Sequence, residues 1–221
     1  MSNAFRARGH ECFTVDFDPQ FPSSLHIDIM ELTVDMILER FGHPDIIWSG
    51  NCCQCFSVAA IGHHRRKNPI TGNLEPKTEK ARKADMVNIH SLKLIQELNP
   101  KFFFIENPVG GLRKMDYMQG IPRYTTTYCR YGFKYRKATD IWTNHPCPNL
   151  KPPCHNGDPC HEAAPRGSKT GLQGVDGARD RSKYPPLLCE HIVDICERCF
   201  DLQPREVKFG LTIKSRDLFD E

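Results

Sequence analysis

Three cysteines lie within four positions of the stretch "WSGNCCQCFS", residues 48–57, which follows the apolar run "PDIIW". A cysteine thiolate is a strong nucleophile and a good metal ligand, whereas a neutral cysteine packs like a small apolar residue. Cys52, Cys53 and Cys55 are therefore candidates for all three roles. The spacing alone does not separate a nucleophile from a metal site or from three buried cysteines.

Acidic residues follow two other runs of strand-like sequence. Glu106 and Asn107 end the run "KFFFIENP", and Asp16 and Asp18 lie at the end of "CFTVDFD". Carboxyl groups move protons in catalysis and accept hydrogen bonds from the hydroxyl groups of ligands. These acids are therefore candidates to work beside the cysteine loop, provided that the fold brings them together.

A second group of metal-binding residue types lies at residues 129–161, among prolines and glycines. This segment has few apolar residues to hold it, so we expect a metal staple, and zinc bound by cysteine and histidine is the usual one. The expected zinc ligands are Cys129, Cys154, Cys160 and His161. Cys147 and His155 compete with Cys129 for its place in this set, and free thiols are the alternative.

The charge is unevenly distributed, although the formal net charge is only +3. Residues 63–83 carry seven Lys/Arg and two Glu, and residues 130–183 carry ten Lys/Arg and five Asp/Glu. Such basic segments are compatible with a polyanionic partner such as nucleic acid, or with solvated loops. We expect no membrane span and no secretory signal, because long apolar runs are missing, and the 11 cysteines then indicate a reducing compartment.

The elements that must position these residues alternate along the chain. Strands are expected at residues 12–18, 24–29, 45–50 and 101–108, and helices at residues 32–41 and 78–98. This order predicts an open α/β sheet with parallel strands. Ligands of such sheets bind beyond the carboxyl ends of the strands, so the cysteine loop, Glu106 and the two aspartates are expected to converge on one edge.

Three motifs of the chain resemble the cytosine-C5 DNA methyltransferases, in particular their short phage-type members. They are Cys53-Gln54 after a strand, "IENP" at residues 105–108, and "RSKYPPLLCEHIVDI" at residues 181–195, and the resemblance covers roughly residues 4–200. It implies a Rossmann-like methyltransferase sheet, mostly parallel. The small irregular segment, for which the cysteines and histidine already predict a zinc staple, stands where similar enzymes have their target-recognition segment. The resemblance also implies S-adenosylmethionine as cofactor and DNA as partner.

The resemblance assigns roles position by position. Cys53 matches the family's nucleophile, Glu106 matches its catalytic glutamate, and Arg136, with Lys137 beside it, matches the arginine that supports the target base. The implied cofactor-binding acids are Asp16, Asp18 and Asp28. Within this set, Asp18 falls where an acid binds the ribose, and Asp28 falls where an acid meets the adenine amino group.

The implied chemistry is covalent catalysis on cytosine. A thiolate that adds to C6 makes C5 nucleophilic toward the methyl group of S-adenosylmethionine. We expect the cysteine loop to lead into a helix N-terminus that lowers the pKa of the thiol, and Glu106 to stabilise the charge that develops at N3. The target base has to leave the duplex to reach such a pocket.

The sequence departs from the family pattern at two places. Cys52 stands where the family has proline before the nucleophile, and the chain begins within the helix that follows the family's glycine-rich cofactor turn. We therefore expect weak binding of S-adenosylmethionine unless another segment, such as "SKYPPLL", completes the pocket. The alternative function is a catalytically impaired, methyltransferase-derived DNA-binding protein that contains zinc, and methylation of RNA or of a free nucleotide is a third.

The expected layout has four parts. An α/β catalytic core at residues 1–128, without the N-terminal strand and glycine loop, precedes a zinc-stapled, target-recognition-like segment at residues 129–181. A helix at residues 182–200 returns to the core, and the tail at residues 201–221 adds an edge strand or is disordered. Candidates for phosphate contacts in the second part are Arg166, Lys169, Arg179 and Arg181. The expected location is cytoplasmic, in a bacterial host cell if a phage encodes the chain.

Overall fold

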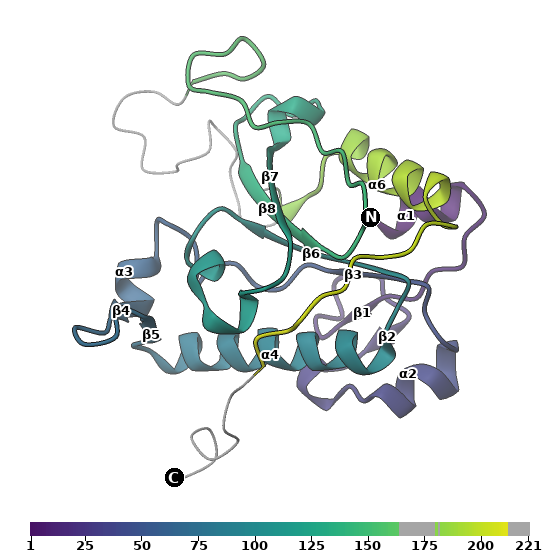
Figure 1. Cartoon of the computed structure of the whole chain (residues 1–221), viewed down its shortest axis with the longest axis horizontal. Coiled ribbons are helices and arrows are strands. Elements are labelled where there is room, and N and C mark those ends of the chain that lie inside the picture. Colours follow the sequence, from purple (N-terminus) through teal and green to yellow (C-terminus); the bar gives the residue numbers. More distant parts are fainter. Residues whose placement is uncertain (164–179, 181, 212–221) are drawn as a thin grey trace.

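A four-stranded sheet forms the centre of the computed structural model, which describes residues 1–163, 180 and 182–211 (Figure 1). Its strand order is β3-β6-β8-β7. The strands are β3 (Ile46–Ser49), β6 (Phe102–Pro108), β8 (Ala138–Thr143) and β7 (Arg123–Thr127). Within the described residues, β3 pairs with β6 on one side and has no partner strand on its other side.

The α/β class is confirmed, but the prediction of a mostly parallel sheet is not. β3 and β6 are parallel, whereas β8 is antiparallel to both β6 and β7. The reason is the connection between β7 and β8, which is the short turn η4 (Tyr128–Tyr131) followed by a few extended residues. A parallel pair needs a crossover of a dozen or more residues, which this connection cannot supply.

Two smaller sheets flank the central one. β1 (Val15–Asp16) and β2 (Leu25–His26) form a parallel pair, and β4 (Arg65–Lys67) and β5 (Leu74–Pro76) form an antiparallel hairpin. The first two strands are shorter than the sequence predicts. The aspartates after β1 turn the chain, because the side chain of Asp16 accepts a hydrogen bond from the backbone N–H of Asp18 at 2.9 Å.

The predicted helices are present, and their ends follow the expected signals. α4 (Glu79–Leu98) starts at Thr78, whose hydroxyl accepts a hydrogen bond from the N–H of Ala81, and ends at Asn99 in the left-handed conformation. α2 (Val34–Phe41) ends at Gly42 with φ +74°. The other helices in the described part of the chain include α1 (Ser2–Ala7), α3 (Ile61–His64), α6 (Pro186–Arg198) and the 3-10 turns η1 (Ile29–Glu31), η2 (Gly111–Lys114) and η3 (Asp116–Met118). Among the described helices, none is both long and apolar enough to span a membrane.

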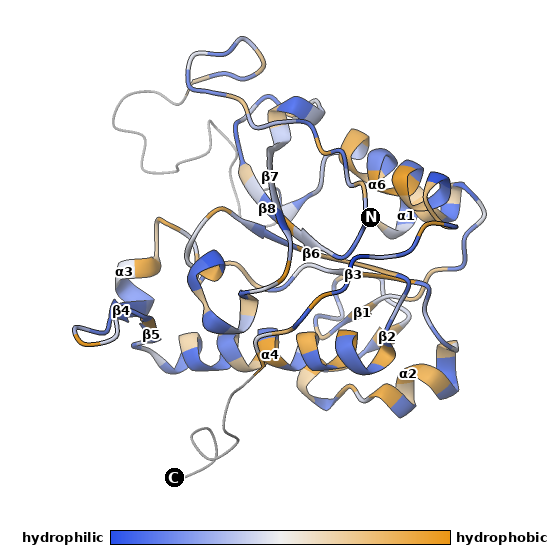
Figure 2. Cartoon of the chain, in the orientation of Figure 1, coloured by the Kyte–Doolittle hydropathy of each residue, from blue (hydrophilic) through white to orange (hydrophobic). Residues whose placement is uncertain are grey.

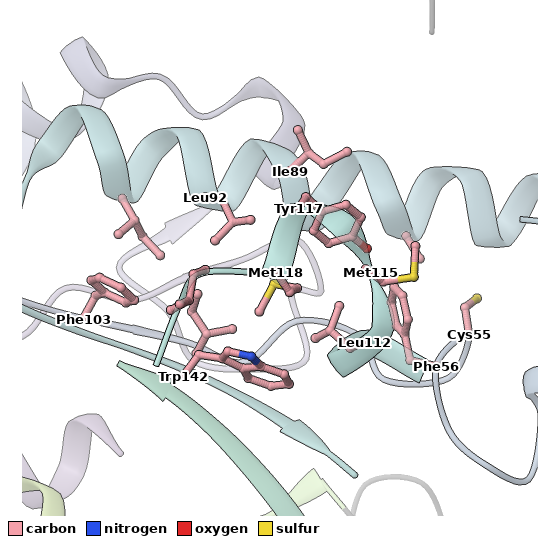
Figure 3. Close-up of a cluster of buried hydrophobic side chains, with 14 of the residues drawn as sticks. Cys55, Phe56, Ile89, Leu92, Phe103, Leu112, Met115, Tyr117, Met118 and Trp142 are labelled. Carbon is pink, nitrogen blue, oxygen red and sulfur yellow. The ribbon is translucent and has the colours of Figure 1, made fainter. Parts of the chain in front are cut away.

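The core consists of two apolar layers, one on each face of the central sheet. Phe103 and Ile105 of β6 pack with Trp142 and the apolar side of α4, as Figure 3 shows for Phe103, Trp142, Ile89 and Leu92. Phe102 and Phe104 pack on the opposite face against α6. Both helices are amphipathic, with apolar and polar sides that alternate in Figure 2. Because β6 is packed on both faces, the groups at its carboxyl end are held rigidly.

Part of the C-terminal tail completes the first of these layers. Val207, Phe209 and Leu211 are partly buried against the cluster below the sheet, and no strand forms there. The chain passes so close to η3 that a Cβ atom on Gly210 would lie 2.5 Å from the carbonyl oxygen of Asp116. The predicted edge strand is absent from residues 201–211, which are instead held by these apolar contacts and by hydrogen bonds such as that from the N–H of Arg205 to the carbonyl oxygen of Asn144 at 2.8 Å.

Candidate active site

The cysteine loop, residues 50–57, follows β3 and is held by β6 and α4. The side-chain amide of Asn107, at the end of β6, donates to the carbonyl oxygen of Asn51 at 3.3 Å. The amide of Asn51 donates in turn to the side-chain oxygens of Asn88 at 3.1 Å and Ser91 at 3.2 Å, both on α4. The loop therefore has a defined conformation although it contains no regular secondary structure.

The three cysteines of this loop occupy different environments. Cys52 is exposed, Cys53 is half-buried, and Cys55 is buried in the apolar layer beside α4 (Figure 3). The backbone N–H groups of Phe56 and Ser57 both donate to the carbonyl oxygen of Cys53 at 3.0 Å, which turns the chain sharply. Of the three thiols, only that of Cys53 is sheltered without being part of the core.

The electrostatic expectation for Cys53 is wrong. Burial raises the pKa of the Cys53 thiol; the nearby Lys137 ammonium opposes this rise and the Glu106 carboxylate adds to it. The predicted helix N-terminus does not contribute, because α3 starts at Ile61 and has four residues. The only nearby group of strong stabilising charge is therefore a lysine rather than a helix dipole.

Glu106 is a deeply buried carboxyl group, with 5% of its surface exposed. The hydroxyl of Tyr128 donates to its Oε1 at 2.9 Å, and the Nζ of Lys137 lies 3.9 Å from the same oxygen. Burial raises the pKa of Glu106, while Lys137 and the hydroxyls of Tyr128 and Tyr184 oppose the rise. Glu106 therefore keeps its proton to a higher pH than an exposed glutamate does.

Arg136 and Lys137 point to different places. The guanidinium of Arg136 donates to the carbonyl oxygen of Cys154 at 3.2 Å and to the side chain of Asn156 at 3.1 Å. Lys137 is buried beside Glu106 and stacks its ammonium over the ring of Tyr128 at 4.6 Å. The structure thus brings Lys137, and not the arginine that the resemblance matched, into the neighbourhood of Cys53 and Glu106. Neighbours in an extended chain point to opposite sides, which explains the difference.

The three predicted cofactor-binding aspartates follow the neighbouring parallel strands β1 and β2. The side chain of Asp18 accepts a hydrogen bond from the N–H of Gln20 at 2.9 Å, and that of Asp28 accepts one from the N–H of Met30 at 3.0 Å. All three therefore shape local turns, and Asp16 and Asp18 share a single one. Their hydrogen bonds are with neighbouring backbone, and none joins them to the Cys53–Glu106 region.

A cavity of about 560 Å³ lies between α1 and the start of α6. It is lined by Met1, Asn3, Ala4, Ala7, Arg8, Tyr184, Pro186, Cys189 and Glu190. Tyr184 connects this cavity with the active-site region, because its hydroxyl acts on Glu106 and also packs against Gly50. A Cβ atom on Gly50 would lie 2.1 Å from that hydroxyl oxygen, so only glycine fits there. The motif that contains Tyr184 was recognised in the sequence, but the contacts of Tyr128 and Tyr184 with Glu106 were not predicted.

The predicted metal ligands lie together in the irregular segment that follows β7. The ligand atoms of Cys129, Cys154, Cys160 and His161 all lie within 4.8 Å of one another. The Sγ atoms of Cys129 and Cys154 are 3.2 Å apart, and the Nδ1 of His161 lies 3.6 Å from the Sγ of Cys160. Cys147 and His155, the competing candidates, are exposed and lie outside this cluster. The four arginine and lysine candidates for phosphate contacts lie outside the described residues.

Comparison with known proteins supports the resemblance seen in the motifs. No family model matches the chain. A curated relative from Frog virus 3 (isolate Goorha), named "Probable DNA (cytosine-5)-methyltransferase", is 28% identical over 209 residues, which cover 85% of this chain and 90% of the relative. The similarity spans both the Cys53–Glu106 region and most of the rest of the fold. The chain is therefore similar, over most of its length, to a protein named as a probable DNA methyltransferase, as its motifs predict.

Proposed function

We propose that this chain methylates C5 of cytosine in DNA, with S-adenosylmethionine as methyl donor and Cys53 as nucleophile. The observation that carries the proposal is the grouping of a sheltered thiol, a buried carboxyl group and a buried ammonium at the carboxyl ends of β3 and β6. The relative named a probable DNA (cytosine-5)-methyltransferase favours this chemistry over other thiol chemistry.

In the proposed reaction the Cys53 thiolate forms a bond to C6 of an extruded cytosine. The electrons of the C5–C6 double bond move toward C5 and N3. Burial raises the pKa of Glu106 and so favours its protonated form, which donates a hydrogen bond or a proton at N3 as negative charge develops there. The ammonium of Lys137 stabilises both the attacking thiolate and the developing charge. Once C5 carries the methyl group, water takes the C5 proton, the C5–C6 double bond re-forms, and the C6–sulfur bond breaks with its electron pair on sulfur, which returns Cys53 as thiolate. Glu106 takes back any proton that it gave to N3.

S-adenosylmethionine, when bound, supplies the electrophilic methyl group. The acidic side chains after β1 and β2 fit the hydroxyl and amino donors of a nucleoside, so we assign Asp16, Asp18 and Asp28 to its ribose and adenine. The cavity beside α1 has a volume within the usual range for small-molecule sites, roughly 300–1,000 Å³. Its lining residue Tyr184 also acts on Glu106, so a group held there would lie next to the reacting base.

We propose that the four-ligand cluster binds zinc with a structural role. Tetrahedral zinc with sulfur ligands at about 2.3 Å places neighbouring sulfur atoms roughly 3.8 Å apart. The sulfur–sulfur separations of 3.2 and 3.6 Å are slightly shorter, so the sulfur atoms need to move apart only a little to hold the ion. All four positions are filled by protein, as in structural rather than catalytic zinc sites.

Trapping with DNA that contains 5-fluorocytosine tests the proposed reaction, because fluorine at C5 prevents the release of the enzyme. Together with S-adenosylmethionine, wild-type protein should form a stable covalent adduct, and Cys53→Ser should form none. Cys52→Ser and Cys55→Ser are matched controls within the same loop and should still form the adduct. An adduct that survives Cys53→Ser would sink the assignment. No adduct and no methyl transfer with any duplex would instead favour a DNA-binding protein without activity.

A further inference from the structure

Positive charge gathers beside the cysteine loop, on a structure that we call the basic arm. It consists of the β4–β5 hairpin and the following residues 77–83. Its exposed cations are Arg66, Lys67, Lys77, Lys80, Arg82 and Lys83. Glu75 and Glu79 neutralise two of them, Arg66 and Arg82, through pairs at 3.5 and 3.0 Å. Lys67, Lys77 and Lys83 have no acidic partner in the part of the chain that the structure describes.

The basic arm lies directly against the loop that carries Cys53. The Nζ of Lys80 donates a hydrogen bond to the side-chain oxygen of Gln54, the residue after the proposed nucleophile. Lys80 and Lys83 also line a shallow cavity of about 170 Å³ together with Cys52 and Cys55. An anion bound by these lysines would therefore lie within a few ångströms of the cysteine loop.

A buried ion pair anchors the arm to this loop. The side chain of Arg65, at the base of the hairpin, is fully buried and pairs with both oxygens of Asp85, at 3.0 and 2.7 Å. Its Nε donates to the carbonyl oxygen of Cys55 at 3.0 Å, and the hydroxyl of Tyr117 completes the shell of Asp85 at 2.8 Å. A buried pair adds little net stability but breaks at high cost, so it fixes the hairpin relative to the loop.

The tip of the hairpin has a defined shape and an exposed apolar residue. The side-chain oxygen of Asn68 accepts hydrogen bonds from the N–H groups of Ile70 at 2.8 Å and Thr71 at 3.0 Å. Gly72 has φ +74°, a conformation that glycine adopts without strain. Ile70 is 92% exposed and has no packing partner. Figure 1 shows the hairpin projecting beyond the N-terminal end of α4, so its tip is free to meet a large partner.

We propose that the basic arm binds the phosphate backbone of duplex DNA on either side of the target cytosine, with Ile70 against the sugars or base edges. This proposal rests on the proposed function. The phosphates that flank a base in the Cys53 pocket must pass close to the cysteine loop, where the unpaired lysines lie. Lysines supply sequence-independent contacts to phosphates, and the anchor at Arg65 keeps those contacts in register with the nucleophile.

The test compares two triple variants with the same loss of charge. The arm variant replaces exposed lysines of the basic arm, and the control replaces exposed cations elsewhere that likewise lack an acidic partner. The arm changes are Lys67→Gln, Lys77→Gln and Lys83→Gln, and the control changes are Arg40→Gln, Lys93→Gln and Lys208→Gln. Binding to a fluorescent DNA duplex is measured by anisotropy between about 50 and 200 mM salt, without cofactor.

The arm variant should lose about tenfold or more in affinity at low salt. The slope of log affinity against log salt concentration should become shallower by up to about 0.9 for each lost phosphate contact. The control variant should bind as wild type does, and because all six side chains are exposed, both variants should unfold at the wild-type temperature. Unchanged binding by the arm variant, an equal loss in the control, or no binding by wild type would overturn the proposal.

Two further outcomes separate this inference from the proposed reaction. Because the assay contains no cofactor and requires no methyl transfer, a loss confined to the arm variant supports the arm even if 5-fluorocytosine traps no adduct. An intact adduct with unchanged DNA affinity in the arm variant would keep the reaction and reject the arm. Equal affinity of wild type for duplex RNA, with the same loss in the arm variant, would reject the assignment to DNA.

Discussion

The Cys53–Glu106 region and the Cys129–His161 cluster both gather reactive side chains, but different forces hold them. Glu106 lies on a strand that is packed on both faces, and the loop of Cys53 is fastened to β6, α4 and the hairpin by side-chain hydrogen bonds. In the cluster, Cys129 lies in η4, and the other three ligands lie in residues 144–163, which follow β8 and form no helix or strand. Only one of its ligands, Cys129, is next to a strand, and the remaining three lie on irregular chain.

This difference separates a site that exists before its ligand from one that the ligand must complete. The apolar layers of the core position the Cys53–Glu106 region without any metal or cofactor. Around the cluster, the chain is fastened by a few bonds such as that from the N–H of Cys154 to the hydroxyl oxygen of Thr127, at 3.1 Å. Under the proposed zinc binding, the four ligand groups of this segment would gain their order from the ion, which would replace the missing apolar core.

Removal of zinc should have the largest effect and should act on one region only. Structural zinc contributes roughly 10–16 kcal/mol of apparent binding free energy, so its loss should unfold the irregular chain at residues 152–163 while the central sheet, including β8, stays folded. Hydrogen exchange before and after chelation, read peptide by peptide, measures this. Cys160→Ala should purify without zinc, and Cys147→Ala, which changes an exposed cysteine outside the cluster, should retain one equivalent. Zinc-free wild-type protein from a preparation without chelator would contradict the staple.

Replacement of the buried carboxyl should act on catalysis and leave the cluster intact. Glu106→Gln keeps the size of the side chain but can no longer give or take a proton, so methyl transfer should fall by about two orders of magnitude. Glu97→Gln, an exposed glutamate on α4, is the matched control and should be fully active. Steady-state transfer of a labelled methyl group measures the effect on catalysis, and the zinc content, measured in parallel, shows whether the cluster is intact. Near-normal turnover would remove Glu106 from the mechanism.

The smallest effect should be a shift in the pH dependence of adduct formation. This shift decides whether Lys137 or Arg136 stabilises the Cys53 thiolate. The thiolate is the reacting form of Cys53, so adduct formation should rise with pH toward the raised pKa of this thiol. Lys137 lowers that pKa, so Lys137→Met should raise it further and move the profile to higher pH. For each unit by which the pKa of Cys53 rises, the rate of adduct formation should fall about tenfold at pH values well below the pKa, and it should not change well above the pKa.

Arg136→Met is the control for this displacement. Its guanidinium binds Cys154 and Asn156, so the profile should keep its position, although the irregular segment loses two contacts. The rate of adduct formation with 5-fluorocytosine DNA in the presence of S-adenosylmethionine, measured across the pH range, reports both variants. A displacement in Arg136→Met and none in Lys137→Met would restore the assignment that the resemblance made.

Local patterns were sufficient to predict part of the core, but β7 and β8 were not among the predicted strands. The apolar repeat of residues 79–98 and its ends at Thr78 and Asn99 predicted α4, and the continuous apolar run before Glu106 predicted a strand buried on both faces. Residue types and spacing also predicted the four members of the metal cluster, because cysteine and histidine in a poorly packed segment have few other uses. Strand direction was not predictable in the same way, since the pairing of β8 depends on contacts with β6 and β7 that no local pattern encodes.

The sequence by itself therefore determined which segments become helix or strand and which loops carry chemistry. Tertiary structure decided which side chains meet: Lys137 rather than Arg136 beside Glu106, Tyr128 and Tyr184 on the same carboxyl, and Arg65 under the cysteine loop. The physical reason is range. Helix capping and apolar periodicity depend on residues a few positions apart, whereas these contacts join residues far apart in the chain. Which side chains of an extended segment face a pocket is decided only when the segment packs against the sheet.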